Sequence, residues 1–226
     1  MGNDIVDLKE PENIGKGRDN CFLGRVFTEE ERERISGSTF PDQFLWALWA
    51  AKEAAYKAVS RVNPAICSIP RRYHVVLTTE DTLKQSVRLV GKVITSHGEL
   101  AIRIDANKEL VHAVAAGSES DLGRICRRID RLDCTDEPAL FVRKNIIRTI
   151  ARCIGCPAHR LRIVKDSAGP GAPSVFLGGK LLTPWISFSH DGRFTAFAFV
   201  PIFEGTKERT PLLRIDSLAR FPVPPQ

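Results

Sequence analysis

The sequence has no apolar run long enough to cross a membrane. A membrane-spanning helix needs about 20 consecutive apolar residues, and the longest apolar stretch, FTAFAFVPIF, is far shorter. The N-terminus also lacks the basic start and apolar core of a secretory signal. We therefore expect a soluble cytoplasmic protein with no membrane partner.

The cysteines are scattered along the chain, and their spacing does not complete a metal site. Of the six cysteines, only Cys153 and Cys156 form a Cys-x-x-Cys motif. A structural zinc site needs four ligands, and no second motif or histidine pair supplies the other two. A redox motif lies between a strand and a helix, whereas this one follows a helical pattern and precedes Pro157. We interpret both residues as structural thiols at a helix end, with Gly155 in the cap.

The net charge of +6 favours an acidic partner. Nucleic acid, a phosphorylated ligand and an acidic protein all satisfy this condition. A nucleic-acid-binding module would cluster Lys and Arg beside exposed aromatic residues, whereas basic residues here are interspersed with acidic ones. We keep that module as an alternative and expect no nucleic-acid partner.

Local patterns in the first half predict an α+β fold. Residues 2–8, GNDIVDL, have the composition of a short strand. Thr28 with Glu31 three residues later is typical of a capping box, and Asp42 is suited to cap a longer helix over residues 43–60. An antiparallel meander is then indicated by four β-rich segments: YHVVLT, SVRLVGKVIT, LAIRID and VHAVAAG.

The second half repeats the order of a helix followed by strands. Residues 137–155 form an amphipathic pattern. Its apolar positions are Phe141, Ile146, Ile147, Ile150 and Ile154. Four strand-like segments follow: LRIVKD, APSVFLGG, WISFSH and RFTAFAFV. Between the last two, Asp191 and Gly192 predict a tight hairpin.

These patterns predict two similar subdomains related by a pseudo-twofold axis, each a helix packed on a small antiparallel sheet. Residues 1–116 form the first subdomain and residues 117–202 the second. GSESDLG, at 117–123, is the expected boundary or linker. Residues 203–226, rich in proline and charge, are expected to form a C-terminal tail on the surface.

Charge lies inside an otherwise apolar helix at LWAAKEAAYKAV, residues 48–59. Glu53 and Lys57 are one helical turn apart, on the face that also carries Trp46 and Trp49. An ion pair on a solvated stripe would explain these two charges. Two tryptophans on the same face indicate instead that the face is covered.

Asp4 lies in a short strand, where aspartate is uncommon. With Glu53 it offers two of the oxygen ligands that a Mg²⁺ ion needs, if phosphate oxygens and water complete the shell. Lys57 would then contact a phosphate. Ser189 and His190 add a hydroxyl and an imidazole at the hairpin tip, although a histidine beside such a turn is also a common surface residue.

The chain resembles the 4′-phosphopantetheinyl transferase superfamily in four segments: GNDIVDL, GRDNCFLGRVFTEEE, WAAKEAAYKAV and ISFSHDGRFTAFAF. Their order, an Asp motif, a Lys-Glu-Ala-x-x-Lys helix and a Ser-His hairpin, is similar to that of the small holo-acyl-carrier-protein synthases. LRIVKDSAGPGAP also resembles the family's strand and Gly-x-Pro turn before Ser-His. The chain's length, however, resembles that of the family's one-chain pseudo-dimers, whereas the small enzymes are trimers.

The resemblance implies a transferase that moves 4′-phosphopantetheine from coenzyme A to a serine of an apo carrier protein, with Mg²⁺, and releases 3′,5′-ADP. It implies Asp4 and Glu53 as metal ligands and, with Lys57, as catalytic residues. It implies Lys57, Ser189 and His190 as ligands of coenzyme A. The single site would lie between the two halves of a monomer.

The metal motif departs from that of the larger family members. These often carry a second metal ligand two residues after the aspartate, where this chain has Val6. Asp7 points to the other face of the strand and does not replace it. We expect water at that position of the metal shell.

Arg18, Phe22 and Arg25 are expected to bind the acidic carrier, because arginine mixed with apolar residues is common in interfaces. Alternatively, Phe22 and Leu23 belong to the core and the arginines are solvated. The sequence does not indicate whether the carrier serves fatty-acid, polyketide or peptide synthesis. A further alternative is an inactive family member that binds coenzyme A or a carrier protein without transfer.

Overall fold

The computed structural model describes residues 1–83, 86–133, 135–165, 173–183 and 185–201. Its helices are α1 (Asn20–Val26), α2 (Glu29–Ser36), α3 (Pro41–Ser60), α4 (Glu119–Arg124) and α5 (Pro138–Ile154), with short 3₁₀ turns η1 (Pro11–Asn13), η2 (Lys16–Arg18), η3 (Pro70–Arg72) and η4 (Ala158–Arg160). Its strands are β1 (Gly2–Asp7), β2 (His74–Leu83), β3 (Ser86–Thr95), β4 (Gly98–Asn107), β5 (Leu110–Ala116), β6 (Cys126–Arg131), β7 (Leu161–Lys165), β8 (Pro173–Leu177), β9 (Lys180–Thr183), β10 (Ile186–Asp191) and β11 (Phe194–Phe199). The expected α+β class is confirmed. The expected tail over 203–226 lies outside the described residues.

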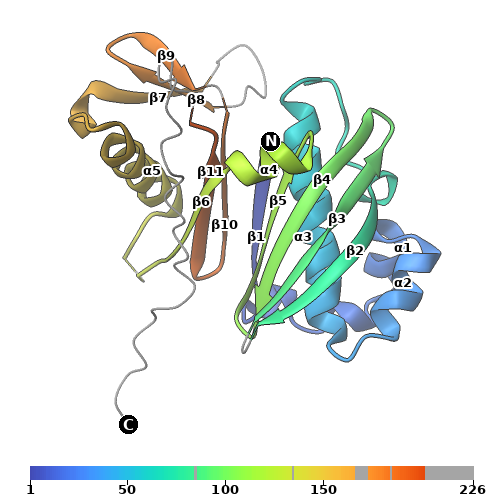
Figure 1. Ribbon diagram of the computed structural model, residues 1–226. Helices are drawn as coiled ribbons and strands as arrows, with labels where there is room; N and C mark the ends of the chain where they lie inside the picture. Colours follow the sequence, from blue (N-terminus) through green and yellow to red (C-terminus); the bar gives the residue numbers. More distant parts are fainter. Residues whose placement is uncertain (84–85, 134, 166–172, 184, 202–226) are drawn as a thin grey trace.

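The first half is a five-stranded antiparallel sheet with α3 across one face (Figure 1). The strand order is β1-β5-β4-β3-β2, so the predicted meander is confirmed and the N-terminal strand joins it beside β5. A row of alanines on α3 lets the helix pack closely on β1. Gly2 is required there, because a Cβ at this position would overlap the backbone of Ala54.

The start of α3 differs from the prediction. The helix begins at Pro41, and its N-cap residue, Phe40, makes no side-chain cap bond. Asp42 is therefore inside the first turn, where a negative charge suits the helix dipole but does not cap it. Proline takes the first position because its fixed φ angle is already helical. The capping box of Thr28 and Glu31 on α2 is confirmed.

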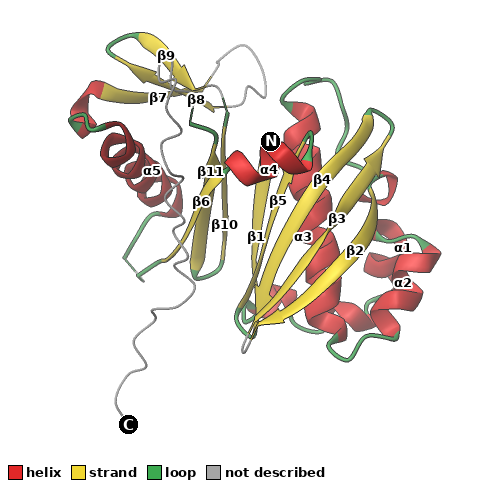
Figure 2. Cartoon of the chain, in the orientation of Figure 1, coloured by secondary structure: helices red, strands yellow, loops and turns green. Residues whose placement is uncertain are grey.

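The second half packs α5 on a three-stranded sheet of order β10-β11-β6. A further three-stranded sheet, β7-β8-β9, lies beside it (Figure 2). The predicted hairpin is confirmed, with Gly192 in a left-handed conformation between paired Asp191 and Phe194. Gly155 caps α5 as expected, also in a left-handed conformation, and Cys153 and Cys156 are free thiols.

Three elements of the second half were missing from the prediction. Residues 117–123 are not a plain linker, because Ser118 caps the short helix α4 there. Strand β6, CRRIDR, alternates charge and apolar residues weakly, and β9 has only four residues. Such short or polar segments give little periodic signal.

The two halves share a strand order. In the first half β1 precedes the long helix α3 and pairs with β5, which pairs with β4. In the second half β6 precedes α5 and pairs with β11, which pairs with β10. This correspondence supports the predicted pair of similar subdomains, whose boundaries and pseudo-twofold axis stay a prediction.

The halves meet sheet against sheet. Ile5 and Leu110 from the first pack on Phe194 and Ala196 from the second. The layers therefore run α3, first sheet, second sheet, α5 (Figure 2). Strand β1 is consequently buried along its whole length. In the part of the chain that the structure describes, no helix is long and apolar enough to span a membrane.

Candidate active site

Strand β1 presents its side chains alternately to the two halves. Gly2, Asp4 and Val6 face α3, whereas Asn3 and Asp7 face the hairpin β10–β11. Polar residues in a strand buried on both faces need partners, since an unpaired buried polar group is costly. The partners of these residues define the site.

Asp4 pairs with Lys57 from α3. The Lys57 Nζ atom lies 2.7 Å from Asp4 Oδ1 and also donates to the Asn3 carbonyl at 3.2 Å. Burial raises the pKa of Asp4, and the Lys57 ammonium only partly offsets this effect. The environment of Asp4 therefore disfavours its charged form, and a further cation would stabilise that form.

Glu53 is half-buried one turn before Lys57 on α3. Its Oε1 atom accepts a long hydrogen bond from the Ser68 hydroxyl at 3.5 Å. Burial raises the pKa of Glu53, and the charge of Asp4 raises it further. The two predicted metal ligands are therefore close enough to repel each other.

This donor set fits a Mg²⁺ ion. Two carboxylates share one ammonium, so the cluster has an excess of negative charge. Within the described ranges no group of three or more metal-ligating side chains occurs. Mg²⁺ commonly binds through one or two carboxylates and keeps phosphate oxygens and water for its other positions. Val6, buried against α3, offers no ligand.

Lys52, the first lysine of the motif, is part of the core. Its side chain is completely buried, and its Nζ atom donates to Glu31 at 2.8 Å and to the Tyr73 carbonyl at 2.6 Å. Glu31 also accepts from the backbone of Thr28 and Val75. The charge in the first half of LWAAKEAAYKAV thus joins α2, α3 and β2, a role that the capping pattern of Glu31 did not reveal.

The tryptophan face of α3 is covered by the chain itself. Phe22 from α1 packs against Trp46 and Trp49, with ring centroids 5.9 and 5.8 Å away. The indole of Trp46 also donates to the Asn13 carbonyl. Phe22 is partly buried in this cluster, whereas Arg18 and Arg25 are exposed at the surface of the same region.

The Ser-His pair is split by the strand that carries it. Ser189 faces β1 and donates to Asn3 Oδ1 at 2.7 Å. His190 is exposed, and because neighbours in a strand point to opposite faces, its ring points away from the Ser189 hydroxyl. The structure therefore brings together Asp4, Glu53 and Lys57. It places Ser189 against the residue next to Asp4, and His190 on the other face of β10.

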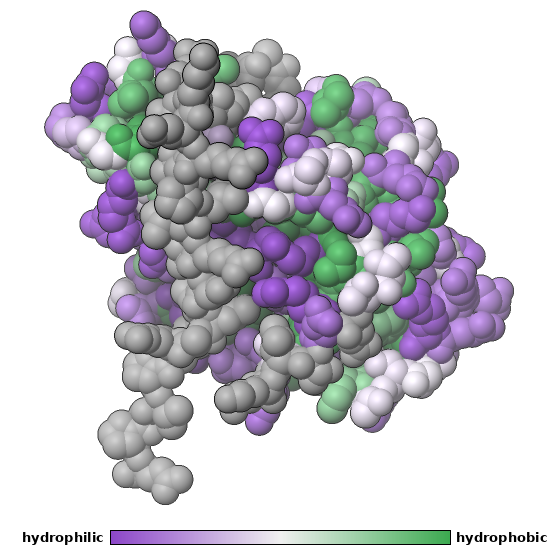
Figure 3. Space-filling view, in the orientation of Figure 1, coloured by the Kyte–Doolittle hydropathy of each residue, from purple (hydrophilic) through white to green (hydrophobic). Residues whose placement is uncertain are grey.

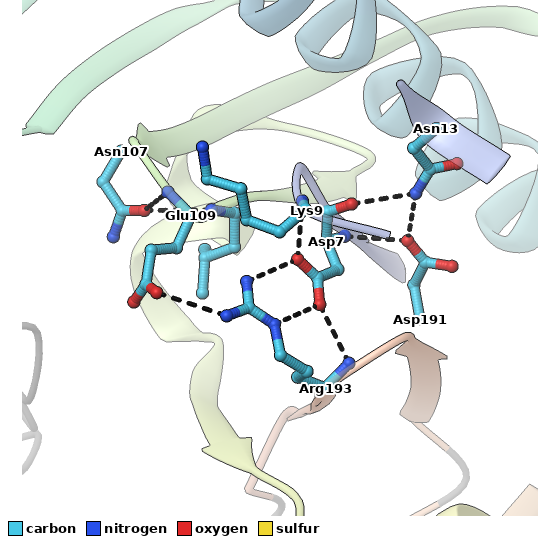
Figure 4. A network of polar contacts seen from close by, with 8 residues as sticks. Asp7, Lys9, Asn13, Asn107, Glu109, Asp191 and Arg193 are labelled. Atoms are coloured by element: carbon cyan, nitrogen blue, oxygen red, sulfur yellow. Dashed lines mark hydrogen bonds and ion pairs between the residues drawn. The ribbon is translucent and has the colours of Figure 1, made fainter. Parts of the chain in front are cut away.

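The sequence analysis missed a clamp between the halves (Figure 4). The guanidinium of Arg193 donates hydrogen bonds to both carboxylate oxygens of Asp7, each at 2.8 Å. Asp191 accepts from the Asp7 backbone at 2.7 Å and from Asn13 at 2.6 Å. Burial raises the pKa of Asp7, but the hydrogen bonds from Arg193 outweigh this effect and leave the pKa below its usual value. An arginine beside an Asp-Gly turn was the available signal.

A buried histidine on the neighbouring strand contacts β1. His112 on β5 is fully buried, with its Nε2 atom 3.4 Å from Asn3 Oδ1. Burial, with the nearby charges of Arg103 and Lys57, lowers the pKa of His112 to about 3. The ring is therefore neutral at physiological pH, and Asn3 joins it to Ser189.

Comparison with known proteins places the chain. Residues 1–115 match the family model described as the 4′-phosphopantetheinyl transferase superfamily. A holo-[acyl-carrier-protein] synthase of Mycoplasma pneumoniae is 29% identical over 104 residues, which are 42% of this chain and 87% of that protein. A holo-[acyl-carrier-protein] synthase of Hydrogenovibrio crunogenus is 27% identical over 119 residues, 51% of this chain and 91% of that protein. The matched half contains Asp4, Glu53 and Lys57, and the chain belongs to the 4′-phosphopantetheinyl transferase superfamily.

Proposed function

We propose that this protein transfers 4′-phosphopantetheine from coenzyme A to a serine of an apo carrier protein, with Mg²⁺, and releases 3′,5′-ADP. The observation that carries the proposal is the cluster of Asp4, Lys57 and Glu53, formed by α3 and by β1, the strand that packs against the second half. Family membership and the two relatives named as holo-[acyl-carrier-protein] synthases support it.

Asp4 and Glu53 would hold the Mg²⁺ ion. When bound, the ion supplies positive charge to the pyrophosphate oxygens of the donor. Lys57 forms an ion pair with Asp4, and its flexible stem would allow the ammonium to turn to a phosphate. Phosphoryl transfer depends mainly on such positioning and charge neutralisation.

The serine proton would pass to Glu53 or to water. A general base works best when its pKa lies near the operating pH, and in the metal-free protein burial and the charge of Asp4 raise the pKa of Glu53. In the reaction the carrier serine oxygen bonds to the β-phosphorus of coenzyme A. The bond from that phosphorus to the bridging oxygen breaks, and 3′,5′-ADP leaves.

Ser189 would act through Asn3. The side chain of Asn3 accepts a hydrogen bond from Ser189, while the backbone carbonyl of Asn3 accepts one from Lys57. The hairpin would thereby fix the position of β1, which carries Asp4 and contacts Lys57 of α3. His190 is exposed on the hairpin and is proposed to contact coenzyme A.

Mass spectrometry of apo carriers tests the proposal. Several apo carriers of fatty-acid, polyketide and peptide synthesis would be incubated with the protein, coenzyme A and Mg²⁺. At least one carrier should gain the mass of one phosphopantetheine, and a carrier with its acceptor serine changed to alanine should not. If every carrier stays unmodified while coenzyme A still raises the melting temperature, the protein is a binding member of the family without transferase activity.

We further propose that the active form is a monomer, because one chain supplies both halves of the site. Sedimentation at the concentration used for the assay should give the mass of one chain. An active species found only as a trimer would place the site between chains instead.

A further inference from the structure

The positive charge of the protein is unevenly distributed. Residues 1–116 carry 16 basic and 16 acidic side chains, so the whole net charge of +6 belongs to residues 117–226. Within these, residues 138–165 contain no acidic residue. Their seven cations are Arg143, Lys144, Arg148, Arg152, Arg160, Arg162 and Lys165. The general mixing of basic and acidic residues therefore does not hold over α5 and β7.

Four residues of α5 form an outward row that we call the α5 row: Leu140, Lys144, Arg148 and Arg152. Their spacing of four residues puts them along one side of the helix, about 6 Å apart. All four are exposed, and Leu140 is 68% exposed. The opposite side of α5 carries the buried residues that pack on the second sheet.

The cations of the α5 row have no acidic partner in the described part of the chain. Some cations of the first half are paired, in contrast to the α5 row. On the face of the first sheet turned away from α3, Arg88 pairs with Asp105 at 2.8 Å and Lys92 with Glu99 at 2.9 Å. Figure 3 shows hydrophilic and hydrophobic side chains interspersed on that part of the surface. Like charges at a spacing of four residues weaken a helix, so an external anion would stabilise α5.

We propose that the α5 row binds an acidic amphipathic helix of a partner protein. Carboxylates spaced one turn apart on such a helix match the spacing of Lys144, Arg148 and Arg152. Leu140 at the end of the row supplies an apolar contact, and cations mixed with apolar groups are typical of protein interfaces. The chain's own residues 202–226 are not complementary, with four basic and three acidic residues.

An acidic protein fits this surface better than nucleic acid does. Single-stranded nucleic acid is held by aromatic side chains on which bases stack. Phe141 is the one aromatic residue in 138–165, and it is partly buried on α5. The row is on α5, and Figure 1 shows α5 on the opposite side of the molecule from α3, the helix that contacts Asp4. A partner bound there leaves the proposed active site open, so the inference does not depend on the proposed function.

The test measures fluorescence anisotropy of a labelled helical peptide with glutamates four residues apart and one leucine at the end of that row. The full-length protein should bind it, and binding should weaken at least about tenfold in the variant Lys144→Glu, Arg148→Glu, Arg152→Glu. The variant Lys144→Gln, Arg148→Gln, Arg152→Gln should weaken binding less. It guards against misfolding, because it adds no charge opposed to the helix dipole.

The matched control is Lys9→Glu, Arg72→Glu, Lys108→Glu, which makes the same change of net charge at exposed residues of the first half. It should bind the peptide like the wild type. Equal weakening in the control, or unchanged binding in both α5 variants, overturns the proposal. Tighter binding of a dT oligonucleotide of equal charge than of the peptide also overturns it. A peptide with the leucine changed to alanine should bind less tightly, and equal binding would contradict the role of Leu140.

Discussion

Helices α3 and α5 occupy corresponding places in the two halves, yet they treat charge in opposite ways. Each follows the first strand of its half and packs on a sheet built in the same order. The lysines of α3 are turned inward, with Lys52 completely buried and Lys57 bound to Asp4. The cations of α5 stand on the surface without acidic partners among the described residues. Equivalent topology therefore fixes where a helix lies and not what it does.

This difference between α3 and α5 arises from the segment that precedes each helix. In the first half residues 8–40 separate β1 from α3 and include α1 and α2. In the second half residues 132–137 alone separate β6 from α5. The longer segment covers α3 with Phe22 and pairs Lys52 with Glu31. Burial then makes charge costly and reactive on α3, whereas α5 keeps a solvated outer face.

The largest expected difference between the helices is in stability. Lys52→Met should lower the free energy of unfolding by about 3–5 kcal/mol, because it leaves Glu31 buried and unpaired. Arg148→Met, on the exposed side of α5, should change it by less than about 0.5 kcal/mol. Urea unfolding of both variants measures the comparison. Similar losses of unfolding free energy in the two variants would contradict the conclusion that Lys52 is buried and Arg148 is exposed.

The next effect concerns transfer activity. Asp4→Asn and Glu53→Gln should each reduce activity at least about a hundredfold, equivalent to about 3 kcal/mol, because each removes a charge from the proposed metal site. The fold should survive, since both changes keep side-chain shape. Asp130→Asn tests the corresponding strand of the second half, where Asp130 pairs with Arg128 and Asn145. It should retain activity.

Initial rates over a range of Mg²⁺ concentrations, with circular dichroism, check this prediction. Both site variants should need more Mg²⁺ than the wild type. Wild-type turnover by either one at low Mg²⁺ would remove that residue from the metal site. A comparable loss in Asp130→Asn would mean that the second half carries part of the chemistry.

The pH dependence of stability should contain a contribution from His112, the histidine buried between the sheets. The pKa of His112 is lowered to about 3, so its contribution to stability is complete above its unfolded value of about 6.5 and is lost as the pH falls toward 3. Between pH 6.5 and 4.5 this loss is about 2–3 kcal/mol. His112→Gln should lack that part of the slope.

The measurement is urea unfolding at several pH values, with the exposed His97→Gln as control. Asp4 and Glu53 act in the opposite sense, because their pKa values are raised and their protonation stabilises the fold as the pH falls. The difference between His112→Gln and wild type cancels their contribution. An unchanged slope in His112→Gln would show that the pKa of His112 does not differ between the folded and unfolded states.

The smallest expected effect is at the proposed carrier surface of the first half. Arg18→Glu with Arg25→Glu should raise KM for the carrier about tenfold and flatten its salt dependence, since exposed charges mainly steer encounter. KM for coenzyme A should stay unchanged. Arg72→Glu with Lys108→Glu is the matched control. An unchanged KM for the carrier would move docking away from α1, and a parallel loss for coenzyme A would assign these arginines to the nucleotide.

The sequence by itself determined the local elements. The capping box of Thr28 and Glu31, the alternation of the meander, the left-handed Gly155 and the hairpin at Gly192 all depend on neighbours within a few residues. The same short range put Glu53 and Lys57 on one side of one helix. Asp4 was noticeable because its residue type did not suit a strand.

Only the tertiary structure decided which residues meet. Asp4 and Lys57 are 53 positions apart, Asn3 and Ser189 are 186, and no local pattern encodes such pairs. The burial of Lys52 and the separation of Ser189 from His190 likewise depend on how α2 and the hairpin pack. The physical reason is one of range: caps and periodicity act within a turn or a strand pair, whereas the pKa values and ion pairs of the site arise when two sheets exclude water between them.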